Sequence, residues 1–246
     1  MFALVPLRPP LYNSVLTPLL SDVAERLYSV ESRLARALAH SRRPRSGITL
    51  VAVTKKFSAS TIAVAYEAGL RDFGENYVQE FAAKHPSLSG LTGARFHFIG
   101  HLQSNKARLA AGLFDTIHAV ESPKLIERLD ASASELGRRL DLLIEVKLSG
   151  EDSKTGADPS AIPELLETAA RCANVSVIGL MTMPPWSTDA ELSRPYFQRL
   201  AALARAHHLA HLSMGMSNDF EVAIEEGATI IRVGTALFGP RPKPTA

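Results

Sequence analysis

Two adjacent lysines, Lys55 and Lys56, follow a short apolar run at residues 48–53 and are candidates for covalent chemistry. Successive side chains of a strand point to opposite faces, so we expect only one of the two amines to face a ligand site at the end of that strand. A partly desolvated lysine has its pKa lowered toward neutrality and forms an imine with an aldehyde. Taken alone, however, the pair is more typical of solvated lysines.

Two glycine-containing stretches near the end of the chain carry the small hydroxyl side chains that phosphate sites use. Residues 213–217 include Ser213 and Ser217, and residues 232–235 include Gly234 and Thr235. In α/β barrels, the loops after the seventh and eighth strands often bind phosphate through backbone N–H groups and hydroxyls. Each glycine by itself is equally typical of a simple turn.

A lysine on a first strand that faces a phosphate site on an eighth strand suits a phosphorylated aldehyde, because these two strands are neighbours in a closed barrel. Pyridoxal phosphate (PLP) carries both groups. The protein group near its pyridine nitrogen tunes the ring, since a carboxylate keeps the nitrogen protonated and an arginine does not. Arg232 lies within the apolar run at residues 230–233, where a charge is costly unless it is paired. Its presence there suggests a role.

The remainder of the sequence predicts the elements that position these residues. From residue 18 to residue 40, apolar residues recur at three- and four-residue steps, which is typical of an amphipathic helix. Short apolar runs then alternate with amphipathic segments of about ten residues. The predicted strands are residues 48–53, 72–74, 96–99, 116–119, 142–146, 177–181, 211–213 and 230–233.

This alternation predicts a single α/β domain, a (β/α)8 TIM-type barrel with an additional N-terminal helix. An open doubly wound sheet has the same alternation, but no glycine-rich dinucleotide fingerprint follows any predicted strand. We assign residues 1–17 to an N-terminal extension and residues 18–246 to a PLP-binding barrel domain. In a barrel, the chemistry lies at the carboxyl ends of the strands, where the candidate residues fall.

The composition limits the other classes of function. The net charge of +2 gives no footprint for nucleic acid or a membrane surface, and the one basic cluster, at residues 42–45, is typical of a solvated linker. The proline-rich first twenty residues resemble neither a signal peptide nor a membrane span. The single cysteine, Cys172, cannot form an internal disulfide, so we expect a cytoplasmic protein.

A metal site is not indicated. His207 and His211 are four residues apart, but no third ligand lies at a suitable spacing. His97 and His118 fall within predicted strands, where we expect core hydrogen bonding rather than metal ligation.

From residue 48 to residue 239 the chain resembles the pyridoxal phosphate homeostasis proteins, also called the YggS or PROSC family, which share the barrel domain of alanine racemase. The motifs that carry this resemblance are LVAVTK (50–55), FGENYVQE (73–80), HFIGHLQSNK (97–106), SKTG (153–156), GLM (179–181), LSMGMS (212–217) and RVGTALFG (232–239). Phe96 stands where the family often has tryptophan, Lys56 replaces a usual threonine or similar residue, and the first twenty residues look like an extension.

The resemblance implies that Lys55, rather than Lys56, carries PLP as a Schiff base. By the same likeness Asn76 and His97 line the cofactor face, and Arg232 approaches the pyridine nitrogen. The residues implied around the phosphate are Ser213, Ser217, Gly234 and Thr235.

Three functions follow as hypotheses. The first is a monomeric PLP carrier without conventional turnover, which maintains intracellular PLP and supplies PLP-dependent apoenzymes. The second is a PLP-dependent amino-acid racemase, which needs a second base; in alanine racemase this is a tyrosine from an added domain that we do not expect here. The third is an aldolase-type barrel that uses its lysine without a cofactor, and such a protein would be colourless.

Overall fold

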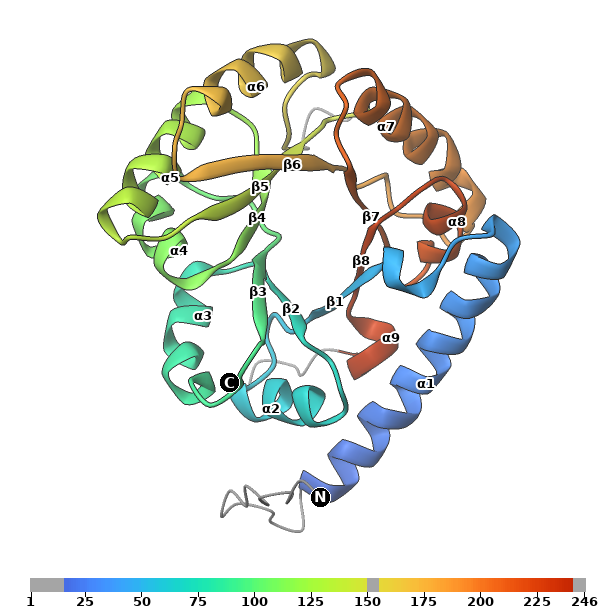
Figure 1. Cartoon of the computed structure of the whole chain (residues 1–246). Coiled ribbons are helices and arrows are strands. Elements are labelled where there is room, and N and C mark those ends of the chain that lie inside the picture. The colour runs from blue at the N-terminus through green and yellow to red at the C-terminus, as the bar shows by residue number, and fades with distance from the viewer. Residues whose placement is uncertain (1–15, 150–154, 241–246) are drawn as a thin grey trace, which may run out of the picture.

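The computed structural model of the chain describes residues 16–149 and 155–240. Within these residues, eight parallel strands close into a barrel in chain order (Figure 1), which confirms the predicted fold. The strands are β1 (Thr49–Val53), β2 (Asp72–Glu75), β3 (Arg95–Phe98), β4 (Thr116–Val120), β5 (Leu140–Glu145), β6 (Val175–Met181), β7 (His211–Met216) and β8 (Ile230–Val233). The predicted extension, residues 1–17, lies outside the described residues except for its last two.

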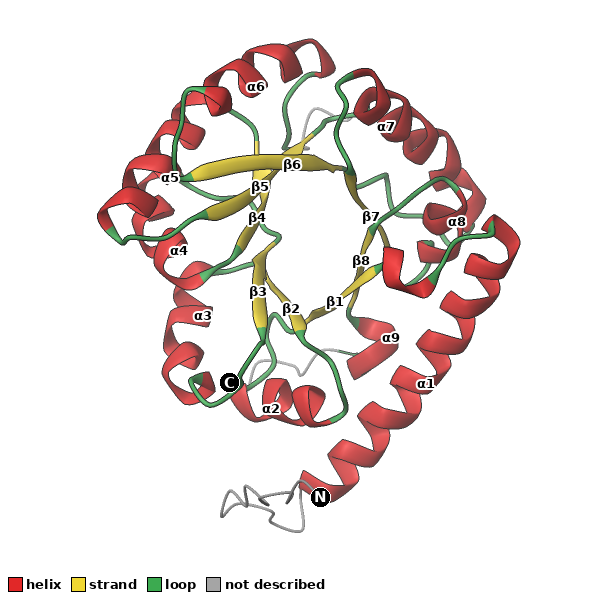
Figure 2. Ribbon diagram, in the orientation of Figure 1, coloured by secondary structure: helices red, strands yellow, loops and turns green. Residues whose placement is uncertain are grey.

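Helices surround the ring of strands on its outer side (Figure 2). They are α1 (Leu16–Ser41), α2 (Ala59–Glu67), α3 (Val78–Lys84), α4 (Ala107–Leu113), α5 (Pro123–Glu135), α6 (Ile162–Ala170), α7 (Arg194–Ala206), α8 (Phe220–Glu225) and α9 (Thr235–Phe238). The additional N-terminal helix α1 packs against α2, α8 and α9 through buried residues that include Val30 and Leu34. None of the helices in the described part of the chain is long and apolar enough to cross a membrane.

The barrel closes between its first and last strands. β1 pairs with β8 in parallel, with Val51 opposite Arg232 and Ala52 opposite Val233. The strand that precedes the lysine pair is therefore hydrogen-bonded to the strand that carries Arg232, as the closed barrel predicted.

Seven of the strands begin and end close to their predicted limits, and β7 differs most. It continues three residues past the predicted end, to Met216. Gly215 lies in this extension with a φ of +90°, and a Cβ on it would come within 2.5 Å of the Ala223 side chain. The pairing of β7 with β8 shifts register there, between Ser213 and Met216. Gly215, which is typical of a turn by its residue type, therefore lies within an irregular strand that packs on α8.

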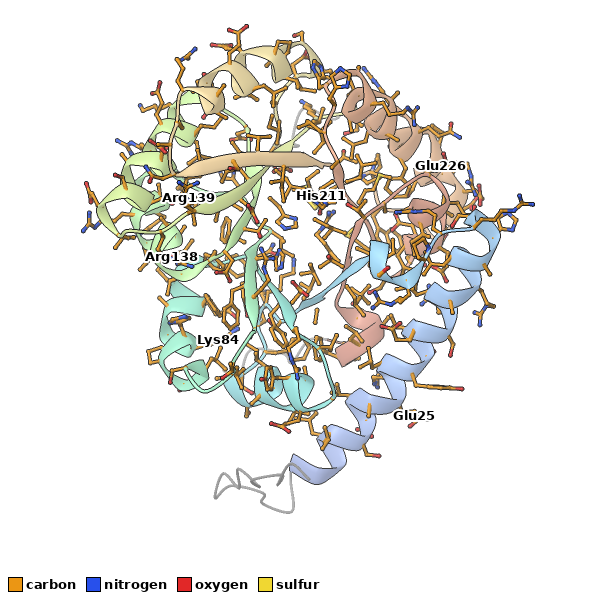
Figure 3. The ribbon with its side chains drawn as sticks, viewed as in Figure 1. Glu25, Lys84, Arg138, Arg139, His211 and Glu226 are labelled. Atoms are coloured by element: carbon orange, nitrogen blue, oxygen red, sulfur yellow. The ribbon has the colours of Figure 1, made fainter. Side chains whose placement is uncertain are left out.

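Alternation of side chains along the strands produces two separate cores. Outward-facing residues pack against the helices, and among them Phe73 and Phe98 are completely buried. Inward-facing side chains fill the ring of strands (Figure 3), so the barrel is packed and is not a pore. The inner apolar cluster is small and consists of Val51, Leu143, Met181 and Ile230, with Ile178 packed on it.

Candidate functional site

A cavity of about 260 Å³ opens where the carboxyl ends of the strands meet. Its volume is near the lower end of the range for small-molecule sites, about 300–1,000 Å³. Six of the eight predicted site residues line it: Lys55, Asn76, Ser217, Arg232, Gly234 and Thr235. The structure therefore brings together residues that are up to 180 positions apart in the sequence.

The two adjacent lysines have different environments. Lys55 lies two residues after β1, is half-buried and lines the cavity, as Val53 does. Lys56 is exposed, has a φ of +65° and donates its backbone N–H to Glu80 Oε1 at 2.6 Å. The left-handed backbone at Lys56 forms part of the turn that leads into α2.

A buried ionic cluster supports this turn from outside the barrel. Glu75, which is fully buried at the end of β2, accepts hydrogen bonds at Oε1 from Thr54 Oγ1 at 2.9 Å and from Lys84 Nζ at 3.0 Å. Lys84, labelled on α3 in Figure 3, also donates to the Thr54 carbonyl oxygen at 3.2 Å and pairs with Glu80 at 2.6 Å. The residue before Lys55 is thus fixed through both its side chain and its backbone.

The surroundings of the Glu75 carboxyl raise its pKa. Burial raises its pKa, and the neighbouring Lys84 ammonium and Thr54 hydroxyl oppose this effect only in part. Its second oxygen, Oε2, is buried and has no hydrogen-bond partner among the described residues.

Asn76 presents a buried acceptor in the cavity wall. Its side-chain oxygen, Oδ1, has no hydrogen-bond partner among the residues that the structure describes. Buried polar atoms in folded proteins are nearly always paired with protein groups, ordered water or a bound molecule. This oxygen is therefore suited to accept a hydrogen bond from a bound molecule.

The opposite wall of the cavity consists of small groups and backbone amides. Ser217 Oγ accepts hydrogen bonds from the backbone N–H groups of Gly234 at 3.3 Å and Ala236 at 3.2 Å. A Cβ on Gly234 would approach Val53 no closer than 3.4 Å, which is ordinary contact. The protein's own packing therefore does not demand a glycine here, whereas close approach of a ligand to the backbone would.

Arg232 is 3% exposed, and its charge is compensated by hydrogen bonds, as its burial required. It donates to Ser213 Oγ at 2.5 Å and to the Thr182 carbonyl oxygen at 3.0 Å. Burial lowers the pKa of Arg232 to about 10, and the carboxylates of Glu145 and Asp219 oppose this effect. Arg232 therefore remains a cation at neutral pH.

The remaining two predicted site residues lie deeper in the barrel. Ser213 and His97 are buried and are not among the residues that line the cavity. Ser213 contacts Arg232 directly, whereas His97 hydrogen-bonds to His118 and to Asp72, each at 3.0 Å. The core hydrogen bonding predicted for the two strand histidines is thus confirmed. Among the described residues, no group of three or more potential ligands could hold a metal ion.

Sequence reasoning missed one prominent cavity residue. Trp186, the only tryptophan of the chain, lines the cavity from the loop between β6 and α7 and is 78% exposed. Its position just beyond a predicted strand could have indicated it, because such loops build the sites of barrels. The cluster of Glu75, Glu80 and Lys84 was also missed, since its members lie on different elements.

Comparison with known proteins decides the family. The family described as "Alanine racemase, N-terminal domain" matches residues 27–242. A pyridoxal phosphate homeostasis protein of Aquifex aeolicus is 41% identical over 226 residues, which cover 89% of this chain and 99% of that relative. The chain belongs to the pyridoxal phosphate homeostasis protein family.

Solved structures agree with this membership. PipY of Synechococcus elongatus, a structure with PLP bound, is 42% identical to this homeostasis-family chain, covers 88% of it over its own full length and has a TM-score of 0.77. An alanine racemase of Clostridium difficile is 13% identical, with a TM-score of 0.68 over 91% of this chain and 61% of the racemase. At that level of identity the racemase supports the shared fold alone.

Proposed function

We propose that this member of the homeostasis family binds PLP in the cavity at the barrel mouth and holds it as a Schiff base on Lys55. The observation that carries the proposal is the convergence of a lysine, an arginine and a hydroxyl-and-amide wall on one cavity. The PLP-bound structure of PipY and the names of the curated relatives support the same ligand.

The residues present fit the chemical groups of PLP. Lys55 supplies the amine for the aldehyde, and Arg232 supplies a cation for the ring-nitrogen side. Ser217, Gly234 and Thr235 supply the hydroxyls and backbone amides from which a phosphate accepts hydrogen bonds. The unpaired oxygen of Asn76 supplies an acceptor. When bound, PLP supplies an aldehyde for imine formation and a conjugated ring that withdraws electrons.

The chain's own residues favour holding this group over reacting through it. Arg232 is a cation at neutral pH and does not stabilise a protonated pyridine nitrogen as a carboxylate partner would, so the ring withdraws electrons less strongly. The cluster of Glu75, Thr54 and Lys84 orients the Lys55 turn from behind. No tyrosine in the described part of the chain lines the cavity.

We therefore propose a carrier that maintains the intracellular supply of PLP without conventional turnover. Its site lies within residues 18–246, and its recipients are PLP-dependent apoenzymes in the cytoplasm. The exposed Trp186 and half-exposed Met183 at the cavity mouth leave an open route for release. An amino-acid racemase is the alternative, because the family model that matches residues 27–242 is described as an alanine racemase domain.

Two measurements test this proposal. Incubation of the purified protein with PLP is expected to give a visible imine chromophore that Lys55→Ala abolishes and Lys56→Ala retains. A protein that stays colourless would favour an aldolase-type lysine instead. A stereochemical assay with a panel of amino acids is expected to show no sustained turnover. Robust racemisation that disappears in Lys55→Ala would replace the carrier with the racemase.

A further inference from the structure

A continuous chain of polar side chains crosses the interior of the barrel. Its five members come from five different strands, and we call them the polar chain: Arg232 of β8, Ser213 of β7, His118 of β4, His97 of β3 and Asp72 of β2. Residues in this interior are usually bulky and apolar, so a polar chain here requires a physical reason.

Each link of the polar chain has hydrogen-bond geometry. Arg232 contacts Ser213 Oγ at 2.5 Å, and Ser213 Oγ lies 2.9 Å from His118 Nδ1. His118 Nε2 lies 3.0 Å from His97 Nδ1, and His97 Nε2 lies 3.0 Å from Asp72 Oδ1. Four hydrogen bonds therefore connect a guanidinium to a carboxylate.

The polar chain joins the two ends of the barrel. Arg232 lines the cavity at the carboxyl ends of the strands. Asp72 lines a second cavity, of about 270 Å³, together with Ile48 and Thr49 at the amino-terminal end of β1. The side chain of Asp72 is 25% exposed, whereas His118 and Ser213 are fully buried.

Burial makes unpaired nitrogens costly along this path. A buried donor or acceptor without a partner loses its hydration with no compensation, so each ring nitrogen must have a definite donor or acceptor role. Burial lowers the pKa of His118 well below its usual value, and the Arg232 cation nearby lowers it further. The His118 ring is accordingly neutral and carries a single proton.

We propose that the polar chain is directed, with every donor pointing toward Asp72, and that it positions the Arg232 guanidinium at the cofactor cavity. A carboxylate oxygen of Asp72 accepts from His97 Nε2 at 3.0 Å, which leaves Nδ1 of a singly protonated His97 ring as an acceptor. His118 then donates Nε2–H to His97 and accepts at Nδ1.

The last link follows from the same rule. Ser213 gives its only proton to His118 and presents lone pairs to Arg232, which donates and never accepts. A carboxylate at the far end of the barrel thus makes Ser213 a dedicated acceptor for Arg232. Asp72 is a positioning residue that acts through three intermediates, and its effect on PLP rests on the function proposed above.

The direction of the polar chain is measurable in the protein without PLP. In proton–nitrogen correlation spectra of the histidine rings near neutral pH, we expect His97 and His118 each to carry one proton, on Nε2. A proton on Nδ1 of either ring, or a doubly protonated His97, would overturn the proposal. This reading needs only the wild-type protein, so a variant that fails to fold does not affect it.

Replacements of Asp72 distinguish its role as the terminal hydrogen-bond acceptor of the polar chain from a role in packing alone. Asp72→Leu removes the terminal acceptor, and we expect the Nε2–H pattern of His97 to be lost. Asp72→Asn keeps a carbonyl acceptor and is expected to retain it, whereas a purely ionic role for Asp72 would make both variants fail alike. Asp141→Asn is the matched control, because Asp141 is the second residue of β5 and pairs only with exposed Arg95 among the described ion pairs.

PLP titration supplies the second readout. Asp72→Leu is expected to weaken PLP binding about tenfold or more and to shift the absorption of the loaded protein, while Asp141→Asn leaves both unchanged. Unchanged PLP affinity in Asp72→Leu with a disrupted ring pattern would overturn the positioning role. Absence of PLP binding in the wild-type protein with the expected ring protons would instead overturn the proposed function and leave the polar chain standing.

Discussion

Gly100 lies so close to Asn76 that a Cβ on Gly100 would come within 2.4 Å of the Asn76 carbonyl oxygen. Such an approach is possible only for glycine unless the backbone moves. Asn76 carries the unpaired oxygen of the cavity wall, so the position of this acceptor depends on the absence of a side chain two residues beyond β3.

We expect Gly100→Ala to weaken PLP binding and to destabilise the fold by about 1–3 kcal/mol, because the added methyl group overpacks a fixed backbone contact. PLP titration and urea unfolding measure the two effects. Gly112→Ala is the matched control. Gly112 lies in α4, and a Cβ on it would meet only the Leu136 side chain, at 3.6 Å. It is expected to stabilise by up to about 1 kcal/mol. Equal stability of Gly100→Ala and wild type would contradict the packing argument.

Lys84→Met is expected to destabilise the protein by about 3–5 kcal/mol, because it leaves the fully buried Glu75 carboxyl without its cation. It also removes the bond to the Thr54 carbonyl oxygen, so PLP affinity should fall as well. Urea unfolding measures the loss of stability.

Two controls distinguish this buried pair from a surface pair. Arg95→Met breaks an ion pair whose side chains are 53% and 38% exposed, and its expected cost is below about 1 kcal/mol. Adding Glu75→Gln to Lys84→Met removes the stranded carboxyl and is expected to recover most of the stability. A double variant as unstable as Lys84→Met would refute the ionic explanation.

Glu145→Gln is expected to gain stability relative to wild type as the pH rises from 4 to 7. Burial raises the pKa of Glu145 above its usual 4.5, with nearby Glu121 adding to the effect and Thr155 opposing it. In wild type the unfolded chain ionises first as the pH rises past 4.5, so folding loses stability until the folded carboxyl also ionises. Glutamine has no such loss and can still accept from Thr155. Urea midpoints of both proteins at the two pH values provide the measurement.

Glu191→Gln is the control of opposite sign. Hydrogen bonding to Arg194 lowers the pKa of the exposed Glu191 carboxyl, so its contribution is present above its unfolded pKa and fades as the pH falls. The glutamine variant should therefore be the less stable protein at pH 7 and should approach wild type at low pH. The same trend in both variants would contradict the assigned pKa shifts.

Ser217→Ala is expected to weaken PLP binding by at least about tenfold, since a hydrogen bond to a charged group contributes about 1.5–3 kcal/mol. Binding of unphosphorylated pyridoxal should change little, because the lost hydroxyl belongs to the phosphate side of the cavity. Ser32→Ala, on α1 and bonded only to the Tyr28 carbonyl among the described contacts, is the control. An equal loss for both aldehydes would argue against a phosphate at Ser217.

The barrel could be predicted because its signals are local. Seven of the eight strands end near their predicted limits, and β8 coincides with its predicted range at residues 230–233. The end of β7 was missed because Gly215 resembles a turn residue, whereas it serves an irregular strand packed on Ala223. Helix α1 begins at Leu16, two residues before the predicted start, as helix ends commonly differ.

The residues of the candidate site could be predicted from the sequence, but their depth within the barrel could not. Strand alternation indicates that His97 and Ser213 face inward, yet it does not say that they lie below the cavity and contact other side chains instead. The contacts that support the Lys55 turn could not be predicted from the sequence, because Glu75 and Lys84 meet only when α3 packs on β2. The cost of a charge within an apolar strand predicted a role for Arg232, but its partners on β7 and beyond β6 required the fold.

The central claim, a Schiff base on Lys55, is tested most directly by borohydride reduction of the PLP-treated protein followed by mass mapping of the modified peptide. The account predicts one pyridoxyl group, on Lys55, with Lys56→Ala labelled as fully as wild type and Lys55→Ala unlabelled. Modification of Lys56 or of scattered surface lysines, with Lys55 unmodified, would contradict it.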